Sequence, residues 1–366
     1  MRRFGLRMTL RSQRISDLVT AVCIPITMVM YLHMMLLPPV SQPSYSEYRD
    51  STASGPFAES VTAADDEPTQ TSDSLRVGPP LNITGNADED LLLMTPLLRC
   101  GATTVRNLLK FLKKDNHFEV VSKPPKKAEV VHIPNVEAQN ELASKLVQQE
   151  GPTAVLQSFS YINFTQFNLT KPIHISVVRE PVERAISWFY HVRAPFQLIE
   201  RHNRFPETSF PTRAFLKKDL ETCLKDRRDR ECRYIPGKEV LGHTIEFFCG
   251  HEPFCPIFAS PEGFHRAKEV VEKEFAVVGI LEEWPKTLAV LEHYIPRYFK
   301  GATEAYFKEM HGNKILTNQN FYKPQVEEKA REYLSRNFTI EFEFYDFLKQ
   351  RLDRQYRAIA ASLPST

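Results

Sequence analysis

Residues 91–112, LLLMTPLLRCGATTVRNLLKFL, join a compact apolar run, a turn with one arginine and one glycine, and a segment with apolar residues at helical spacing. Such a run is typical of a strand buried in a parallel sheet, and the spacing after it predicts a helix. The turn places backbone N–H groups, Gly101 and two threonine hydroxyls at a helix N-terminus, where an anion is readily held. The turn lacks the Walker pattern GxxxxGK[ST], which disfavours an ATPase or GTPase.

Residues 174–193, HISVVREPVERAISWFYHVR, repeat the order of strand, turn and helix. Arg179 follows the strand, and an arginine at that edge of a parallel sheet points into the crevice where such sheets bind ligands. Its guanidinium suits bidentate contact with phosphate, and Ser187 on the next helix adds a hydroxyl donor. A surface arginine paired with Glu180 or Glu183 is the alternative interpretation. The first segment favours an anion site built from both.

Beyond residue 90 the chain alternates short apolar runs with longer amphipathic segments, which indicates an α/β fold. Further strands are predicted at 128–134 and 275–281, and further helices at 263–275, 282–299 and 325–337. Pro and Gly mark turns at 124–130, 151–155 and 167–172. The 366 residues, 42% of them apolar, suffice for a sizeable core, and the net charge of +2 gives no general attraction to nucleic acid.

Residues 18–37 carry no formal charge when His33 is neutral, and twenty residues are enough to cross a bilayer. Five arginines precede them and an acidic, Ser/Thr/Pro-rich stretch follows, so the positive-inside rule places residues 1–17 in the cytosol. This predicts a type II single-pass signal-anchor. A cleaved signal peptide is the alternative, but its apolar region is normally shorter and no small-residue cleavage site follows closely.

Residues 38–90 are poor in large apolar side chains and rich in Ser, Thr, Pro, Asp and Glu. Such a composition does not bury enough surface to offset the entropy of ordering, so a flexible lumenal stem is predicted. The globular domain is predicted at 91–357 and a C-terminal tail at 358–366.

Of the six cysteines, Cys23 lies in the predicted membrane span and Cys100 in the turn after the first strand. The other four form an even set in the predicted lumenal domain, which favours disulfides. Their close spacing suggests two small local loops, and the absence of a CxxC pair disfavours zinc. These cysteines are Cys223, Cys232, Cys249 and Cys255. Four Asn-x-Ser/Thr sequons suit the same compartment, and they are at Asn82, Asn163, Asn168 and Asn337.

Several motifs resemble known carbohydrate sulfotransferases. REPVERAISWFY resembles their 3′-phosphate-binding segment, and RCGATTV stands where they have a 5′-phosphosulfate loop. IPGKEV, IEFFCGHEPFC, FAVVGILEE, IPRYFKGATEAY and EFEFYDFLKQ resemble the uronyl 2-O-sulfotransferase, Pipe and heparan sulfate 2-O-sulfotransferase family, over about residues 90–355.

The resemblance implies a PAPS-sulfotransferase (P-loop-like) fold with a central parallel sheet flanked by helices, binding 3′-phosphoadenosine 5′-phosphosulfate (PAPS) at the C-terminal edge of the sheet. It implies a type II protein of the Golgi membrane that sulfates the 2-hydroxyl of uronic acids in heparan, dermatan or chondroitin sulfate. The resemblance implies a homo-oligomer such as a trimer. It implies no metal. The family's paired cysteines match Cys223 with Cys232 and Cys249 with Cys255.

Carried onto this chain residue by residue, the resemblance predicts cofactor-binding and substrate-binding positions. The cofactor positions are Arg99, Cys100, Gly101, Ala102, Thr103, Thr104, Arg179 and Ser187. Asn107 is predicted to contact the substrate.

Four positions depart from the family pattern. The catalytic lysine falls on Arg99, the loop serine on Ala102, the histidine base on Ser158, and a substrate-facing arginine on Pro96. Sulfuryl transfer needs a base for the acceptor hydroxyl and a cation for the leaving group. Arg99 supplies charge but no proton, and loss of a general base lowers rates by about 10²–10⁴-fold.

Glu180 and His174 are the nearest substitutes for the base in the sequence. Candidate basic groups for a polyanionic acceptor lie at 123–127 and 224–233, and at Arg193, Arg201 and Arg204. Interleaved acidic residues favour a solvated, self-neutralised loop at 224–233, and a turn before a strand explains 123–127 equally well. Two functions follow. One is a uronyl 2-O-sulfotransferase with a relocated base, and the other is a catalytically impaired relative that binds PAPS or glycosaminoglycan as a scaffold.

Overall fold

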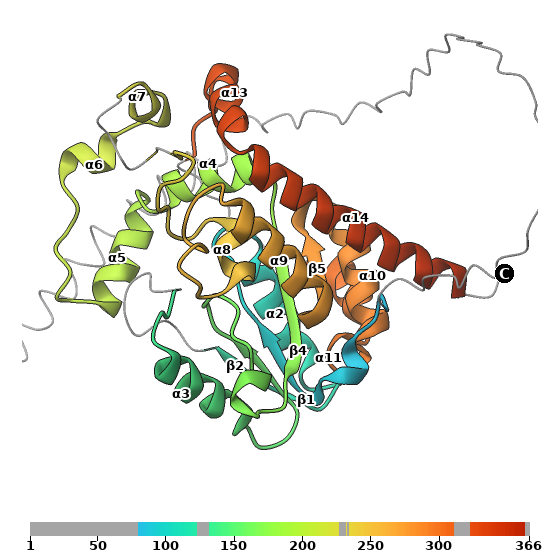
Figure 1. Cartoon of the computed structure of the whole chain (residues 1–366). Coiled ribbons are helices and arrows are strands. Elements are labelled where there is room, and N and C mark those ends of the chain that lie inside the picture. Colours follow the sequence, from blue (N-terminus) through green and yellow to red (C-terminus); the bar gives the residue numbers. More distant parts are fainter. Residues whose placement is uncertain (1–79, 123–131, 227–231, 233, 311–322, 363–366) are drawn as a thin grey trace, which may run out of the picture. The chain divides into compact units, whose positions relative to one another are not determined.

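The computed structural model describes residues 80–122, 132–226, 232, 234–310 and 323–362 (Figure 1). All of them belong to one compact unit, Ser74–Thr366. The predicted membrane span at 18–37 and the predicted basic cluster at 123–127 lie outside the described residues. Within these ranges no helix is both long enough and apolar enough to cross a membrane.

Five parallel strands form one sheet in the order β2-β3-β1-β4-β5. The strands are β1 (Asp88–Met94), β2 (Glu119–Ser122), β3 (Thr153–Leu156), β4 (Pro172–Val178) and β5 (Phe275–Ile280). β1 lies between β3 and β4, and the chain runs to one side of it first and to the other side afterwards. A ligand crevice is expected at such a reversal of strand order, at the carboxyl ends of the strands.

The α/β fold and three of the predicted strands, now β1, β4 and β5, are confirmed. Two predictions are wrong. Residues 132–134 are not a strand, and the rest of the run predicted at 128–134 lies outside the described residues. The segment interpreted as a turn at 151–155 overlaps β3, which begins at Thr153.

Helices surround the sheet. The α-helices are α2 (Ala102–Leu112), α3 (Val136–Val147), α4 (Pro181–His191), α5 (Pro195–Arg204), α6 (Arg213–Lys217), α7 (Leu220–Lys225), α8 (Thr244–Cys249), α9 (Pro261–Glu274), α10 (Trp284–Tyr294), α11 (Pro296–Phe299), α12 (Ala302–Glu304), α13 (Glu328–Asn337) and α14 (Thr339–Ser362). Shorter helical turns are η1 (Thr84–Asn86), η2 (Thr165–Phe167), η3 (Leu281–Glu283) and the π-helical η4 (Ala305–Met310). Figure 1 shows α10 and α14 beside β5, and both contact it.

Polar caps and prolines begin the helices that follow the loops. Asn135 accepts a hydrogen bond from Ala138 N–H at the start of α3. Ser260 does the same for Gly263 in α9, with Pro261 in the first turn. These side chains satisfy amide groups that the helix itself leaves without partners.

Both faces of the sheet are covered by apolar side chains. Leu92 belongs to the largest core cluster together with Leu108 of α2. Its neighbour Leu93, on the other face, packs in a second cluster with Leu146 of α3. This arrangement explains why residues 91–94 of β1 are apolar in succession instead of alternating with polar residues.

Glu341 ties the start of α14 to α8. Its carboxylate is 2% exposed, lies 2.8 Å from His243 Nδ1, and accepts hydrogen bonds from the N–H groups of Thr244 (3.1 Å) and Ile245 (3.4 Å). Burial opposes ionisation, but the hydrogen bond from His243 and the other bonds hold the pKa of Glu341 below its usual value. The buried carboxylate is therefore well satisfied.

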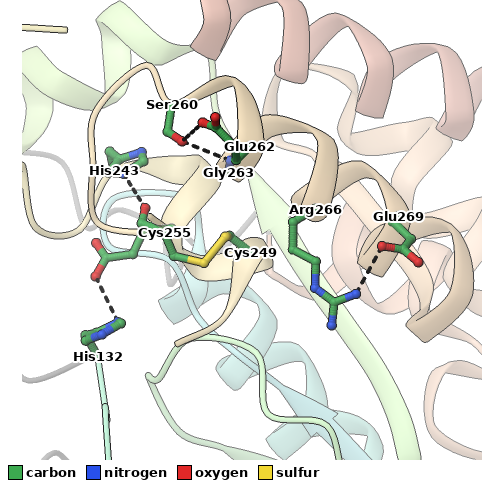
Figure 2. The surroundings of a disulfide bond; sticks show 10 residues. His132, His243, Cys249, Cys255, Ser260, Glu262, Gly263, Arg266 and Glu269 are labelled. Carbon is green, nitrogen blue, oxygen red and sulfur yellow. Dashed lines mark hydrogen bonds and ion pairs between the residues drawn. A yellow bond between two sulfur atoms is a disulfide. The ribbon is translucent and has the colours of Figure 1, made fainter. Parts of the chain in front are cut away.

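Two disulfides confirm the predicted cysteine pairs. Cys223 in α7 pairs with Cys232, and Cys249 at the end of α8 pairs with Cys255. Figure 2 shows the second bond, with His243 hydrogen-bonded to the Cys255 carbonyl.

Candidate functional site

The loop after β1 has an unusual backbone. Arg99 adopts a left-handed conformation with φ of 67°, and Gly101 has φ of 80°. A Cβ at Gly101 would lie 2.8 Å from Leu281 Cδ1 in η3, so only glycine fits without displacement. A left-handed arginine costs about 1–3 kcal/mol, and such strain is found most often at ligand sites.

Side chains from three neighbouring segments hold this loop by donating to its carbonyls. These hydrogen bonds run from Ser158 Oγ to Pro96 (3.0 Å), from Ser176 Oγ to Thr95 (2.9 Å) and from Arg184 Nε to Leu98 (3.3 Å). The loop is therefore fixed to the end of β3, to β4 and to α4.

The structure brings together the two predicted phosphate-binding segments. Arg99 Nε donates to Ser187 Oγ at 2.9 Å, and Ser187 is buried in α4. The guanidinium of Arg99 also donates to His191 Nδ1 at 3.2 Å. Burial and the nearby charge of Arg179 lower the pKa of Arg99. Two guanidinium groups at one half-buried place favour an anionic ligand.

Counter-ions hold Arg179 in position. Its guanidinium lies 3.1 Å from Glu183 and 3.9 Å from Glu282. Glu183 also pairs with Lys323 (2.9 Å) and Arg331 (2.6 Å). Burial opposes ionisation of Glu183, but the hydrogen bonds from Lys323 and Arg331 hold its pKa at about 2. Three cations thus contact the Glu183 carboxylate, and one of them, Arg179, also faces Glu282.

Lys323 and Arg331 escaped the sequence prediction, as did His191. Lys323 and Arg331 lie 140 and 148 residues from Glu183, and neither stands in a recognisable motif. The one sequence signal available for these three residues is the spacing of His191, which lies one turn after Ser187 on the same helix.

The remaining predicted cofactor residues line the start of α2. Residues 102–104 form its first turn, no side chain caps the helix, and its first internal bond runs from Val105 N–H to the Gly101 carbonyl. Cys100 is buried, and burial raises the pKa of its thiol to about 11, so the thiol stays neutral. Asn107, predicted for the substrate, is half-buried further along α2.

Ser158 serves as a support for the loop. Its hydroxyl donates to Pro96, so two positions that depart from the family pattern contact each other. The hydroxyl has no described base beside it that could activate it. Ser158 therefore holds the loop to the end of β3.

Neither substitute base is available. His174 is 1% exposed in β4, among the rings of Tyr161, Phe164 and Phe275. Glu180 caps α4 by accepting from Glu183 N–H. Both side chains have structural roles.

Acidification is expected to destabilise the fold through His174. Burial, together with the charge of Lys171, lowers its pKa to about 3, whereas an unfolded histidine titrates near 6.5. The unfolded chain binds this proton first, so stability is complete above pH 6.5 and falls as the pH decreases towards 3. The free energy of unfolding should drop by about 2–3 kcal/mol between pH 7 and 4.5 from this group. His174→Leu should lose that part of the dependence in denaturant titrations at both pH values, and parallel pH profiles would contradict the assignment.

The arginines considered for acceptor binding differ in their surroundings. Arg193 is 7% exposed, and its guanidinium packs on the rings of Phe189 (3.6 Å) and Phe215 (4.2 Å), so it fastens α6 to α4. Arg204 pairs with Glu200 at the surface. Most of the basic part of the 224–233 cluster lies outside the described residues.

The all-parallel sheet, the left-handed turn before α2 and the arginine and serine after β4 are the features that the comparison with known families has to explain. Residues 86–348 match the pattern of the sulfotransferase family, and the chain belongs to this family. It is 35% identical to the uronyl 2-sulfotransferase homolog pip of Drosophila melanogaster over 76% of this chain and 55% of that protein. It is 28% identical to human uronyl 2-sulfotransferase over 69% of this chain and 60% of that protein.

A further relative is the heparan sulfate 2-O-sulfotransferase hst-2 of Caenorhabditis elegans, 24% identical over 73% of this chain and 79% of that protein. The family resemblance is confirmed. The chain spans little more than half the length of the Drosophila and human relatives.

Proposed function

We propose that the protein is a PAPS-dependent sulfotransferase that acts on the 2-hydroxyl of a uronic acid in a glycosaminoglycan. The observation that carries this proposal is the convergence of Arg99, Arg179 and Ser187 at the carboxyl edge of the sheet. The printed names of the relatives support the acceptor class.

The residues present fit PAPS, and the proposed domain has the PAPS-sulfotransferase fold. Arg179 and Ser187 would hold the 3′-phosphate, and the first turn of α2 would hold the phosphosulfate. PAPS supplies the sulfuryl group and, after transfer, an anionic leaving group. Arg99 neutralises this charge without giving up a proton, since a guanidinium stays protonated.

We place the domain in the Golgi lumen, with residues 18–37 as a type II anchor. The predicted stem at 38–90 is shorter than expected at its C-terminal end, because Ile83 belongs to the core and β1 begins at Asp88. The two disulfides support an oxidising compartment. A homo-oligomer is part of the same proposal and rests on family resemblance.

Transfer of labelled sulfate from PAPS to desulfated heparin and dermatan tests the function. The double variant Arg99→Lys with Ser158→His serves as a reference, because it restores the family lysine and base. Transfer by the unmodified protein supports the enzyme. Absence of transfer to either acceptor, with retained binding of adenosine 3′,5′-bisphosphate, supports the impaired scaffold instead. The engagement of the Ser158 hydroxyl with Pro96 is the observation that favours this second candidate.

Glycan occupancy should differ between the two adjacent sequons. Asn163 lines a cavity, and its side chain accepts a hydrogen bond from Thr165. Asn168 ends η2 in a left-handed turn outside this cavity. Because a glycan on Asn163 would fill the cavity, modification is expected at Asn168 and not at Asn163. Glycopeptide mass spectrometry of the protein secreted from animal cells measures both sites, and the reverse pattern would contradict the expectation.

A further inference from the structure

A chain of contacts connects the candidate site with the cavity beside Asn163. Arg184 donates to the carbonyls of Leu98 and Gly242. Gly242 N–H donates to Glu246, whose carboxylate faces His132 of the cavity. The volume of the cavity is about 360 Å³, within the usual range for ligand pockets, and His132, His251, Tyr161 and Arg266 also line it. Ser158, which holds the loop at Pro96, stands three residues before Tyr161, a span of at most about 11 Å of chain. These contacts connect the cavity to the loop at Pro96 and Leu98.

Four polar atoms near this cavity are buried and have no hydrogen-bond partner among the described residues. They are Glu246 Oε1, His132 Nδ1, His251 Nε2 and Ser160 Oγ. Buried polar atoms are almost always paired in folded proteins, so such a concentration indicates a place for a polar ligand or water. The described residues contain no group of three or more His, Cys, Asp or Glu placed to hold a metal ion.

The hydrogen bonds assign different roles to the two histidines. Ile133 N–H donates to His251 Nδ1 at 2.9 Å, so neutral His251 carries its proton on Nε2. His132 Nδ1 faces the buried Glu246 carboxylate at 4.0 Å. At this distance there is no direct hydrogen bond, and the carboxylate acts through its negative charge. That charge favours the proton on Nδ1 of His132, which leaves Nε2 with a lone pair. In Figure 2, His132 lies below the Cys249–Cys255 disulfide.

Both histidines are neutral near pH 7. Burial lowers the pKa of His132, and burial with the neighbouring His132 lowers that of His251 to about 4. The rings are 5.3 Å apart, edge to face. The other charged groups that act on the pair are Glu239, near His132 and Glu246, with His243 and Arg184 facing Glu246.

We propose that His132 is the general base of the sulfate transfer and that Glu246 is its positioning residue. This inference rests on the proposed function. The acceptor oxygen forms a bond to sulfur while the bond from sulfur to the bridging phosphate oxygen breaks, and that electron pair leaves with adenosine 3′,5′-bisphosphate. The hydroxyl proton passes to His132 Nε2, and the Glu246 carboxylate stabilises the imidazolium.

Ring-nitrogen NMR of the full chain, labelled at histidine, tests the pair without turnover. His132 should be protonated on Nδ1 in its neutral form. Glu246→Gln should lower the pKa of His132 by about half to one unit, because it removes the charge that stabilises the imidazolium. His265→Gln, at an exposed site on α9, is the matched control and should cause no shift. Protonation on Nε2, or an unchanged pKa in Glu246→Gln, would overturn the pairing.

Kinetics test the catalytic role. His132→Gln should lower kcat by about 10²–10⁴-fold while the affinity for adenosine 3′,5′-bisphosphate stays within about twofold. Adding Ser158→His to that variant should raise kcat at least tenfold, because it places a base at the position where the family has its histidine. Thermal unfolding checks that each variant folds, and Glu246→Gln replaces His132→Gln in the kinetic comparison if the latter does not.

The outcomes separate the two proposals. If the unmodified protein transfers sulfate and the kcat of His132→Gln is within threefold of it, the base assignment alone is overturned. Loss of kcat without rescue by Ser158→His would indicate a structural role for His132 and would also overturn it. An unmodified protein that transfers sulfate to neither acceptor would overturn both proposals.

Discussion

Replacing Arg179 by alanine is expected to weaken binding of adenosine 3′,5′-bisphosphate by about 100-fold or more. Arg179 lies beside Arg99, and a bidentate contact between guanidinium and phosphate is among the stronger hydrogen-bonded pairs. Hydrogen bonds to charged groups contribute about 1.5–3 kcal/mol each, and 2.7 kcal/mol corresponds to about 100-fold in Kd. The loss also leaves Glu183 and Glu282 facing the incoming anion with less compensation. Isothermal titration calorimetry at fixed ionic strength measures the change.

Two further variants sharpen this test. Arg179→Lys keeps the positive charge but loses the two parallel N–H donors of the guanidinium. The affinity for adenosine 3′,5′-bisphosphate is expected to fall by about tenfold. Arg204→Ala removes a surface arginine that pairs with Glu200, and should leave the affinity within about twofold. An Arg179→Ala protein that binds as tightly as the unmodified protein would show that the anion site lies elsewhere.

Replacing Glu341 by alanine should lower the free energy of unfolding by about 3–5 kcal/mol. The substitution leaves His243 and the first amides of α8 buried without their acceptor, which is the costly way to break a buried charged pair. Chemical denaturation followed by far-UV circular dichroism measures the loss. The disulfide between Cys249 and Cys255 is to be kept intact in all samples.

Glu343→Ala is the matched control, because Glu343 is exposed on the same helix two residues away. Its effect should stay within about 0.5 kcal/mol, as for most surface substitutions. Glu341→Gln retains one acceptor oxygen and should fall between the two. Equal stability of the Glu341 and Glu343 variants would contradict the structural role assigned to this carboxylate.

The strands that the sequence predicts are those with long apolar runs. β1, β4 and β5 have six or seven residues each, and four residues of β1 and all residues of β4 and β5 are buried. β3 has four residues directly after Gly151 and Pro152, so the turn signal masked it. β2 has only two apolar residues, Val120 and Val121. Short strands of this kind are recognised only through their neighbours in the sheet.

The candidate site was predictable where it follows motifs in sequence. Arg99, Arg179 and Ser187 stand in two strand–turn–helix segments, and the structure brings them together. Pairs such as Lys323 with Glu183, or His132 with Glu246, join residues more than a hundred positions apart. Single-sequence patterns carry no information about such contacts, because they depend on how the elements pack.

The left-handed backbone at Arg99 sets a limit on how stable this domain can become. Glycine at that position would relieve about 1–3 kcal/mol of backbone strain and would be selected in any search for thermostability. The same change would remove the cation that contacts Ser187 and His191. Stability and ligand binding thus compete at a single residue, and a stabilised variant that keeps function has to gain its free energy elsewhere in the fold.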